Sequence, residues 1–245
     1  MSNLFSDLPT LALRLAIIVL SLAVHEAAHA LSARWLGDPT AEREGRVTLN
    51  PLAHLDAQGS LIVPGLLLLS QGLAGTNSTF VFGWAKPVPV DPRDFKKPFL
   101  GMALVAAAGP ASNILLALLG AQVLEGASFA GFGLRDPHAV VLLPFVAINV
   151  ALAVFNLIPI PPLDGSKILW GPMFPHMPLR FREWYASLLP GQRLLGPLLA
   201  VLALGLALHF LGFDPWGWFN HAWRAAFLAM LGLIFAVTDL AWAWL

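Results

Sequence analysis

The run LPTLALRLAIIVLSLAVHEAAHALSARWL, residues 8–36, decides the fold. An α-helix needs roughly 20 consecutive, mostly apolar residues to cross the hydrocarbon core of a bilayer, and this run exceeds that length. The whole chain has the same character, because 58% of its 245 residues are hydrophobic and only 11% are charged. A soluble domain carries about 25% charged residues. The composition therefore indicates a membrane protein and argues against a soluble, disordered or nucleic-acid-binding chain.

Charge and cysteine content narrow the possibilities further. The formal net charge is zero, so the chain offers no electrostatic attraction to a polyanion. It contains no cysteine, which excludes disulfides, thiolate metal sites and a cysteine nucleophile.

Four more stretches are long and apolar enough to be predicted as transmembrane helices, namely residues 99–124, 139–158, 194–212 and 222–245. A sixth apolar segment, residues 61–75, is shorter and contains one proline and three glycines, so it is expected to be re-entrant or to make a sixth crossing. Residues 46–49 and 79–84 have the composition of strands and predict a small β-hairpin region on the cytosolic side.

The sequence thus predicts an all-α polytopic membrane protein with five transmembrane helices, the short sixth segment and the β-hairpin region. We expect residues 1–245 to form a single domain, with a core at 8–170 and a C-terminal helical pair at 194–245. If residues 61–75 do not cross, the loops 37–98 and 165–193 face one side and carry ten Lys or Arg residues. Positive charges gather on the cytosolic side of membrane proteins, so this bias places the N-terminus outside and the C-terminus in the cytosol.

The first helix carries the sequence His25-Glu26-Ala27-Ala28-His29. Residues at positions i and i+4 lie on one face of a helix, so both imidazoles can reach one metal ion. The spacing is the HExxH pattern of zinc proteases, in which the glutamate between the ligands is the general base. An ionisable group inside a membrane helix is costly and marks a functional site. The alternative is a polar patch that packs against other helices.

A catalytic zinc ion takes three protein ligands, so a third ligand is expected within the membrane region. Asp164 is the best candidate, because it ends the stretch NLIPIPPLD, in which three prolines prevent a continuous helix. The alternative is an interfacial Pro-Asp-Gly turn. Asp164 and the histidine pair both lie near the far ends of their predicted spans. They can share one ion only if those ends face the same side, which is the topology that the loop charges favour.

With these motifs the chain resembles the site-2 protease family of intramembrane zinc metalloproteases, and most closely its small prokaryotic members without PDZ or CBS domains. The resemblance is carried by HEAAHA at 25–30, NPLAHLD at 50–56, FGWAKPVPV at 82–90, AGPASN at 108–113 and FNLIPIPPLDG at 155–165. It implies one Zn²⁺ per chain, bound by His25, His29 and Asp164, with Glu26 as the catalytic base. It also implies a multi-pass protein of a prokaryotic cell membrane that hydrolyses peptide bonds within or near the transmembrane helix of a substrate protein, with the active site towards the cytosol.

Three further residues are weaker candidates for the site. The amide of Asn156 is expected to donate a hydrogen bond to the developing oxyanion or to a substrate carbonyl, with a helix-packing role as the alternative. Asn113 is predicted to be a packing residue first and an oxyanion or substrate contact second. His54 is a candidate for oxyanion stabilisation or for an alternative ligand, although a loop histidine more often caps a turn.

Two other functions use the same residues. A metal-ion or small-solute transporter would use the His and Asp residues as a transit site, but the chain shows neither the repeats nor the paired broken helices of such proteins. A non-catalytic membrane scaffold would have no need of all four catalytic-type residues. The expected partners are a transmembrane substrate and the lipid bilayer, without nucleic acid. The sequence does not predict the oligomeric state.

Overall fold

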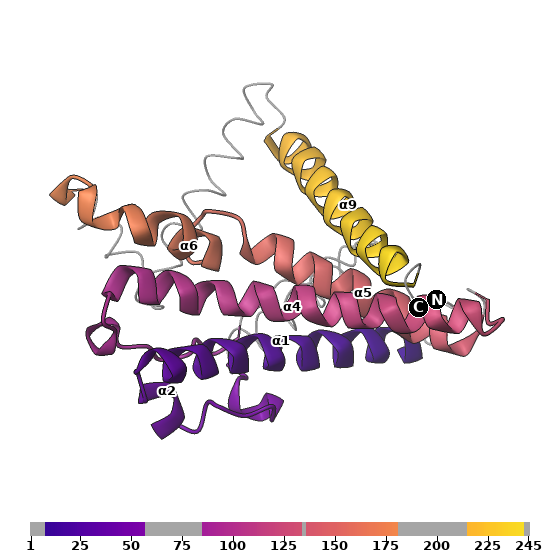
Figure 1. Cartoon of the computed structure of the whole chain (residues 1–245), viewed down its shortest axis with the longest axis horizontal. Helices are drawn as coiled ribbons and strands as arrows, with labels where there is room; N and C mark the ends of the chain where they lie inside the picture. The colour runs from indigo at the N-terminus through magenta and orange to yellow at the C-terminus, as the bar shows by residue number, and fades with distance from the viewer. Residues whose placement is uncertain (1–7, 57–84, 134–135, 181–214, 243–245) are drawn as a thin grey trace, which may run out of the picture.

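The computed structural model describes residues 8–56, 85–133, 136–180 and 215–242, and over these residues it is helical without any strand (Figure 1). Its long helices are α1 (Leu8–Leu36), α4 (Pro98–Phe129), α5 (Pro137–Asn156) and α9 (Pro215–Trp242). The shorter helical elements are α2 (Thr40–Arg43), η1 (Pro51–Ala53), η3 (Pro92–Asp94), α6 (Asp164–Met173) and η4 (Phe174–His176).

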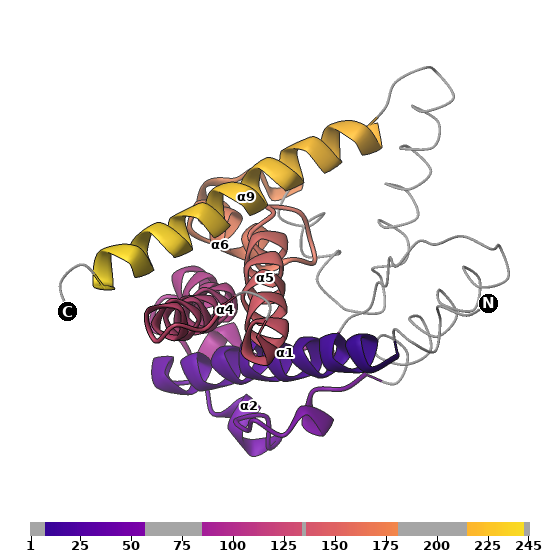
Figure 2. The ribbon, with the colours of Figure 1, turned by 90° about the vertical axis from the view of Figure 1, so that its right-hand side faces the viewer.

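Helix α4 lies at the centre of the described structure and contacts α1, α5, α6 and α9. Helix α9 packs on the side of α4 and α5 that is opposite α1 (Figures 1 and 2). A core cluster joins α4, α5 and α9 through Ala117, Ala121, Val146, Val150, Val154 and Ile234. The cluster consists of short and β-branched side chains, so the three helix backbones approach one another closely.

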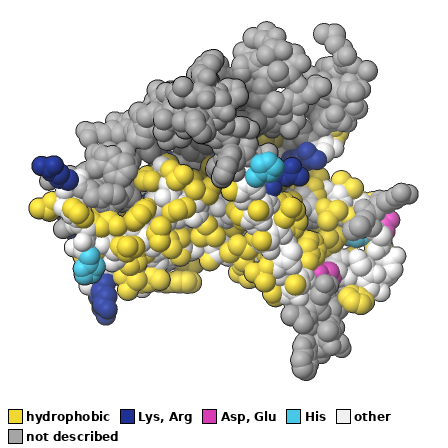
Figure 3. Space-filling view, turned by 90° about the horizontal axis from the view of Figure 1, so that it is seen from above, with side chains coloured by type: hydrophobic (Ala, Val, Ile, Leu, Met, Phe, Trp, Pro, Cys, Tyr) yellow, Lys and Arg dark blue, Asp and Glu magenta, His cyan; other side chains and the backbone are white. Residues whose placement is uncertain are grey.

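Three of these helices are long and apolar enough to cross a membrane, over Ala12–Leu36, Pro98–Phe129 and Pro137–Asn156. Many of their large apolar side chains point outward, among them Leu20, Leu104, Leu115 and Leu119. Hydrophobic side chains cover most of the described part of the face shown in Figure 3. An exposed apolar surface of this extent marks contact with a membrane or another apolar partner, and the length of the helices identifies the membrane.

The last turn of α1 directs the chain into the loop that leads away from the bundle. Gly37 has a φ of +110°, and the N–H of Asp38 donates to the carbonyl of Ala33, which together form a helix-ending Schellman arrangement. The buried carboxylate of Asp38 then accepts from the backbone N–H groups of Thr40 and Asp91, each over 2.8 Å. This side chain therefore ties the end of α1 to the segment just before α4.

The predicted β-hairpin is wrong. Residues 46–49 form no strand, because side chains take the hydrogen-bonding positions that a neighbouring strand would use. The imidazole of His54 lies 2.9 Å from the carbonyl oxygen of Thr48, and Arg46 donates to the carbonyl of Lys86. Such local side-chain bonds compete with sheet formation. The second predicted strand, residues 79–84, lies outside the described residues.

The expectation of five transmembrane helices is also corrected over the part of the chain that the structure describes. There, three helices qualify as candidate spans, and the stretch predicted at 222–245 belongs to α9, whose apolar section Arg224–Thr238 is shorter than a span. The stretches 61–75 and 194–212 lie outside the described residues. Helix α1 ends and α4 begins at the same end of the bundle, since Phe95 packs beside Ala33 and Leu36.

Candidate metal centre

Three side chains from two distant parts of the chain converge between α1, α4 and the start of α6. Nε2 of His25 lies 3.0 Å from Nε2 of His29, and each of these atoms lies 3.2 Å from Oδ2 of Asp164. All three residues are buried, with 3%, 8% and 6% of their surfaces exposed. Within the described residues this is the group of His, Asp and Glu side chains that could hold a metal ion.

The opposite nitrogen of each imidazole has its own partner. Nδ1 of His29 lies 2.7 Å from the carbonyl oxygen of Val105, and Nδ1 of His25 lies 2.6 Å from Oδ1 of Asn113. Because a backbone carbonyl only accepts, the ring proton of His29 is on Nδ1, and its Nε2 carries a lone pair when the ring is neutral. In a metal site the other ring nitrogen of a ligating histidine makes such a bond, which fixes the tautomer.

The space between the two rings depends on a glycine of α4. A Cβ atom at Gly109 would lie 2.5 Å from Nε2 of His25 and 2.5 Å from Nε2 of His29. No other residue type leaves that volume open. Gly109 therefore keeps a small buried space next to the three ligand atoms, and this is the space that a metal ion requires.

Asp164 reaches the histidines because the chain turns sharply after α5. That helix ends at Asn156, and a segment with three prolines follows before α6 starts at Asp164 itself. A Cβ on Gly165 would collide with the carbonyl group of Leu157 and would lie 2.6 Å from the carbonyl oxygen of Ile158, so only glycine fits this turn. The ammonium of Lys167 lies 3.5 Å from Oδ1 of Asp164, which leaves Oδ2 for the histidines.

The donor set fits zinc. Two imidazole nitrogens and one carboxylate oxygen form one of the three-ligand sets found in catalytic zinc sites. Bonds of about 2.0 Å at tetrahedral angles place ligand atoms about 3.3 Å apart, and the observed separations are 3.0–3.2 Å. Three lone-pair atoms at such distances repel one another unless a positive charge lies among them, either a proton or a metal ion.

Glu26 and Asn156, the two predicted catalytic residues, lie outside this triangle. Glu26 follows His25 directly in α1, is half-buried and has no hydrogen bond or ion pair with any other described residue. Asn156 is the last residue of α5 and is half-buried, and its amide nitrogen donates to the carbonyl of Leu152 over 3.0 Å. Their catalytic roles stay predictions.

Asn113 and His54 also lie outside the triangle of ligand atoms, and their oxyanion or substrate contacts stay predictions. The amide oxygen of Asn113 lies against Nδ1 of His25, on the side of the ring opposite the ligand atom. His54 is 2% exposed and is not part of the metal-binding group. Since its Nε2 faces the carbonyl oxygen of Thr48, Nε2 carries a proton, and Nδ1 has no hydrogen-bond partner among the residues that the structure describes.

The sequence did not single out three residues that shape this site: Val105, Gly109 and Lys167. Gly109 stands within AGPASN, and its signal was a glycine in the middle of an apolar helix, where glycine is unfavourable without a packing reason. Lys167 lies three residues after Asp164 in α6, a spacing at which side chains meet. Val105 contributes only its backbone and left no signal.

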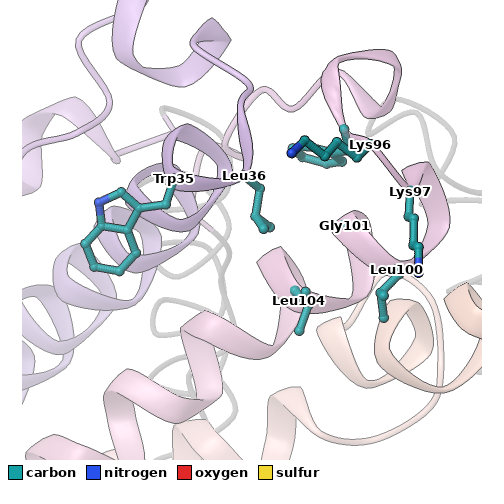
Figure 4. A pocket seen from close by; sticks show the side chains of 8 residues that line it. Trp35, Leu36, Lys96, Lys97, Leu100, Gly101 and Leu104 are labelled. Carbon is teal, nitrogen blue, oxygen red and sulfur yellow. The ribbon is translucent and has the colours of Figure 1, made fainter.

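A separate hollow of about 360 Å³ lies where the end of α1 meets the start of α4. Figure 4 shows Trp35 and Leu36 from α1 beside Leu100 and Leu104 from α4, with Lys96 just before α4. No member of the metal-binding group lines this hollow, so it is not part of the candidate metal centre.

Over the residues that the structure describes, fold and site together define a helical membrane protein with a buried cluster of three side chains that could bind a metal ion. The chain is similar to "Putative zinc metalloprotease YwhC" of Bacillus subtilis, with 40% identity over 156 residues, which cover 62% of this chain and 65% of the relative. It is also similar to "Putative zinc metalloprotease Rip2" of Mycolicibacterium smegmatis, with 32% identity over 163 residues, which cover 65% of this chain and 55% of the relative. No family model and no solved structure matches the chain.

Both relatives carry the name putative zinc metalloprotease, and this supports the resemblance to the site-2 protease family. The chain spans somewhat less than two thirds of the first relative and about half of the second. The names therefore support a metalloprotease, and its substrates and its place of action are matters of proposal.

Proposed function

We propose that the chain is an intramembrane zinc metalloprotease that hydrolyses peptide bonds within or near the transmembrane helix of a substrate protein. The observation that carries the proposal is the triangle formed by Nε2 of His25, Nε2 of His29 and Oδ2 of Asp164, with sides of 3.0–3.2 Å. Its histidines belong to α1, a helix long and apolar enough to cross a membrane.

The depth of the site supports hydrolysis inside the membrane region. His25 and His29 lie eleven and seven residues before the end of α1, or about 16 Å and 10 Å along the helix at 1.5 Å per residue. The site thus lies within the span but nearer one end, where water has a short path. From the loop charges, we assign that end to the cytosol.

The residues of the predicted site have distinct tasks in the proposed reaction. His25, His29 and Asp164 would hold the zinc ion, which when bound supplies a Lewis acid that polarises the scissile carbonyl group and lowers the pKa of water. The carboxylate of Glu26 takes a proton from the attacking water and delivers it to the leaving amine nitrogen. The amide of Asn156 donates a hydrogen bond to the oxygen on which negative charge develops.

An apolar cavity of about 460 Å³ borders the segment that carries Asp164. One wall comes from the end of α5 and the following turn and the other from α9, with Val154, Leu157, Ile158, Ile160, Ala222, Ala226 and Met230 as lining residues. No member of the metal-binding group lines this cavity, but its apolar wall on the segment that leads to Asp164 favours an apolar substrate segment over a soluble peptide. This cavity supports a membrane-helix substrate class.

The test uses purified protein in detergent with a reporter substrate that contains one transmembrane helix. Wild type is compared with Glu26→Gln, and bound zinc is measured in both. The proposal expects about one zinc ion per chain in both proteins and cleavage by wild type only, since Glu26 moves protons and is not a ligand.

Other outcomes point to other functions. Zinc binding without cleavage by either protein would favour a metal-ion transporter, and equal cleavage by both would remove Glu26 from the mechanism. A wild-type chain that binds no zinc would refute the ligand assignment.

A further inference from the structure

Three polar side chains lie behind His25, away from Asp164, and all are inaccessible to solvent. They are Asn113 of α4, Asn149 of α5 and Ser21 of α1, with 0%, 0% and 1% of their surfaces exposed. The amide nitrogen of Asn113 donates to Oδ1 of Asn149 over 2.9 Å. The amide nitrogen of Asn149 donates to Oγ of Ser21 over 3.0 Å and to the carbonyl of Phe145 over 2.9 Å. The chain of bonds thus links three helices to one ligand.

The carbonyl of Phe145 sets the direction of every bond in this chain. A backbone carbonyl only accepts, so the amide nitrogen of Asn149 faces it and Oδ1 of Asn149 faces Asn113. Asn113 must then present its nitrogen to Asn149 and its oxygen to His25. That oxygen lies 2.6 Å from Nδ1 of His25, which therefore carries the ring proton.

We propose that Asn113 and Asn149 form a positioning relay that holds the ring proton of His25 on Nδ1 and so presents the Nε2 lone pair to the metal. Without Asn149, nothing fixes the amide of Asn113, which can rotate and offer its nitrogen to Nδ1 of His25. The ring proton then moves to Nε2 and occupies the position of the metal. The inference rests on the proposed function only in taking that metal to be zinc.

The two histidines differ in how their protons are held, and this difference supplies an internal control. His29 donates directly to the backbone carbonyl of Val105, which no side-chain substitution removes. His25 depends on two asparagine side chains. Loss of Asn149 should therefore change the proton position of His25 and leave that of His29 unchanged.

The experiment compares Asn149→Leu, which keeps the volume and removes the hydrogen bonds, with Asn149→Asp, which keeps the acceptor that Asn113 uses. Ser128→Ala is the control, because Ser128 lies fifteen residues beyond Asn113 in α4 and its side chain also donates to a carbonyl four residues earlier, that of Leu124. Zinc dissociation constants are measured by competition with a chelator in detergent. Ring-proton positions are read by ¹⁵N NMR of histidine-labelled, zinc-free protein.

We expect Asn149→Leu to weaken zinc binding by about 10-fold, the lower end of the effect of removing a direct partner of a metal-ligating histidine, because Asn149 acts on His25 only through Asn113. Asn149→Asp and Ser128→Ala should stay within about threefold of wild type. A residue that only fills space would show the reverse order, with Leu tolerated. Wild-type affinity in Asn149→Leu, together with an unchanged His25 spectrum, would overturn the relay.

The wild-type spectrum tests the relay even if Asn149→Leu does not fold. A His25 ring whose proton is on Nε2 in the wild-type protein contradicts the proposal directly. The outcome is also separate from that of the proposed function. A chain that cleaves nothing but shows the expected proton position and zinc affinities keeps the relay and loses the protease activity.

Discussion

Replacing Gly109 by alanine places one methyl group beside the metal centre. The new Cβ would lie 2.5 Å from Nε2 of His25 and 2.5 Å from both Nε2 and Cε1 of His29. Gly109 is in the interior of α4, where alanine has the better helix propensity, so the backbone itself does not resist the change. The effect of Gly109→Ala therefore falls on the two histidine rings.

The magnitude follows from the distances. Ordinary van der Waals contact begins at 3.4 Å, so each ring must move by about 0.9 Å. Zinc–ligand distances tolerate deviations of about 0.2 Å. A shift several times larger separates the ligand atoms, and we expect zinc affinity to fall by more than about 100-fold, beyond the usual effect of changes around the ligands. The crowding should also lower the free energy of unfolding by about 1–3 kcal/mol.

The assay is a chelator competition in detergent, run beside thermal unfolding of the zinc-free protein. Gly120→Ala is the matched control, because its Cβ would lie 2.8 Å from the ring of Phe145 and 3.0 Å from Val146, in the same helix but away from the ligands. Gly120→Ala should lose a similar amount of stability and keep its zinc affinity. If Gly109→Ala binds zinc as tightly as wild type does, the space beside the rings is not where the metal lies.

Three further changes test the surrounding structure. Gly165→Ala forces a Cβ into the carbonyl of Leu157 and should displace Asp164, so we expect a loss of bound zinc, measured by atomic absorption. Gly232→Ala is the control, because its Cβ meets no atom within 4 Å. Asp38→Ala leaves two backbone N–H groups without their acceptor and should lower the free energy of unfolding, measured in denaturant, by about 1–3 kcal/mol per group. The hydrogen bond from Arg93 lowers the pKa of Asp91 from 3.8 to about 2, so the stabilisation that Asp91 gives should be complete above pH 3.8 and disappear as the pH falls to about 2. An unfolding difference between wild type and Asp91→Asn that does not shrink over that range would contradict the assignment.

The convergence of the metal-binding group was predictable because chemistry and spacing agree in one short sequence. His25 and His29 are one helical turn apart in an apolar run, and no packing role explains two histidines there. Asp164 was predictable for the same reason, since a carboxylate after a proline-broken apolar stretch needs a partner. The relay residue Asn149 was missed, although it stands seven residues before Asn156 and therefore on the same face of α5.

The error in the β-hairpin has a physical origin in side chains that the composition of residues 46–49 does not reveal. Arg46 is only 2% exposed and donates to the carbonyl of Lys86, and the N–H of Lys86 donates to the carbonyl of His54. Lys86 is therefore joined to the segment 46–54 by its own backbone and by the guanidinium group of Arg46, and not by a ladder of backbone hydrogen bonds. Strand propensity describes how side chains fit the pleated surface of a sheet. It does not anticipate a buried arginine side chain that bonds to the backbone of Lys86.

The register between α1 and α4 explains why the site forms where it does. On α1, Ser21, His25, His29 and Ala33 recur every four residues and form one ridge; on α4, Val105, Gly109, Asn113, Ala117 and Ala121 do the same. Ridges of residues spaced four apart pack into the grooves of a neighbouring helix. The helices run in opposite directions, so His29 meets Val105 while His25 meets Asn113. A shift by one turn would place each imidazole against another α4 residue and break both of these hydrogen bonds, so the two histidines themselves favour the observed register.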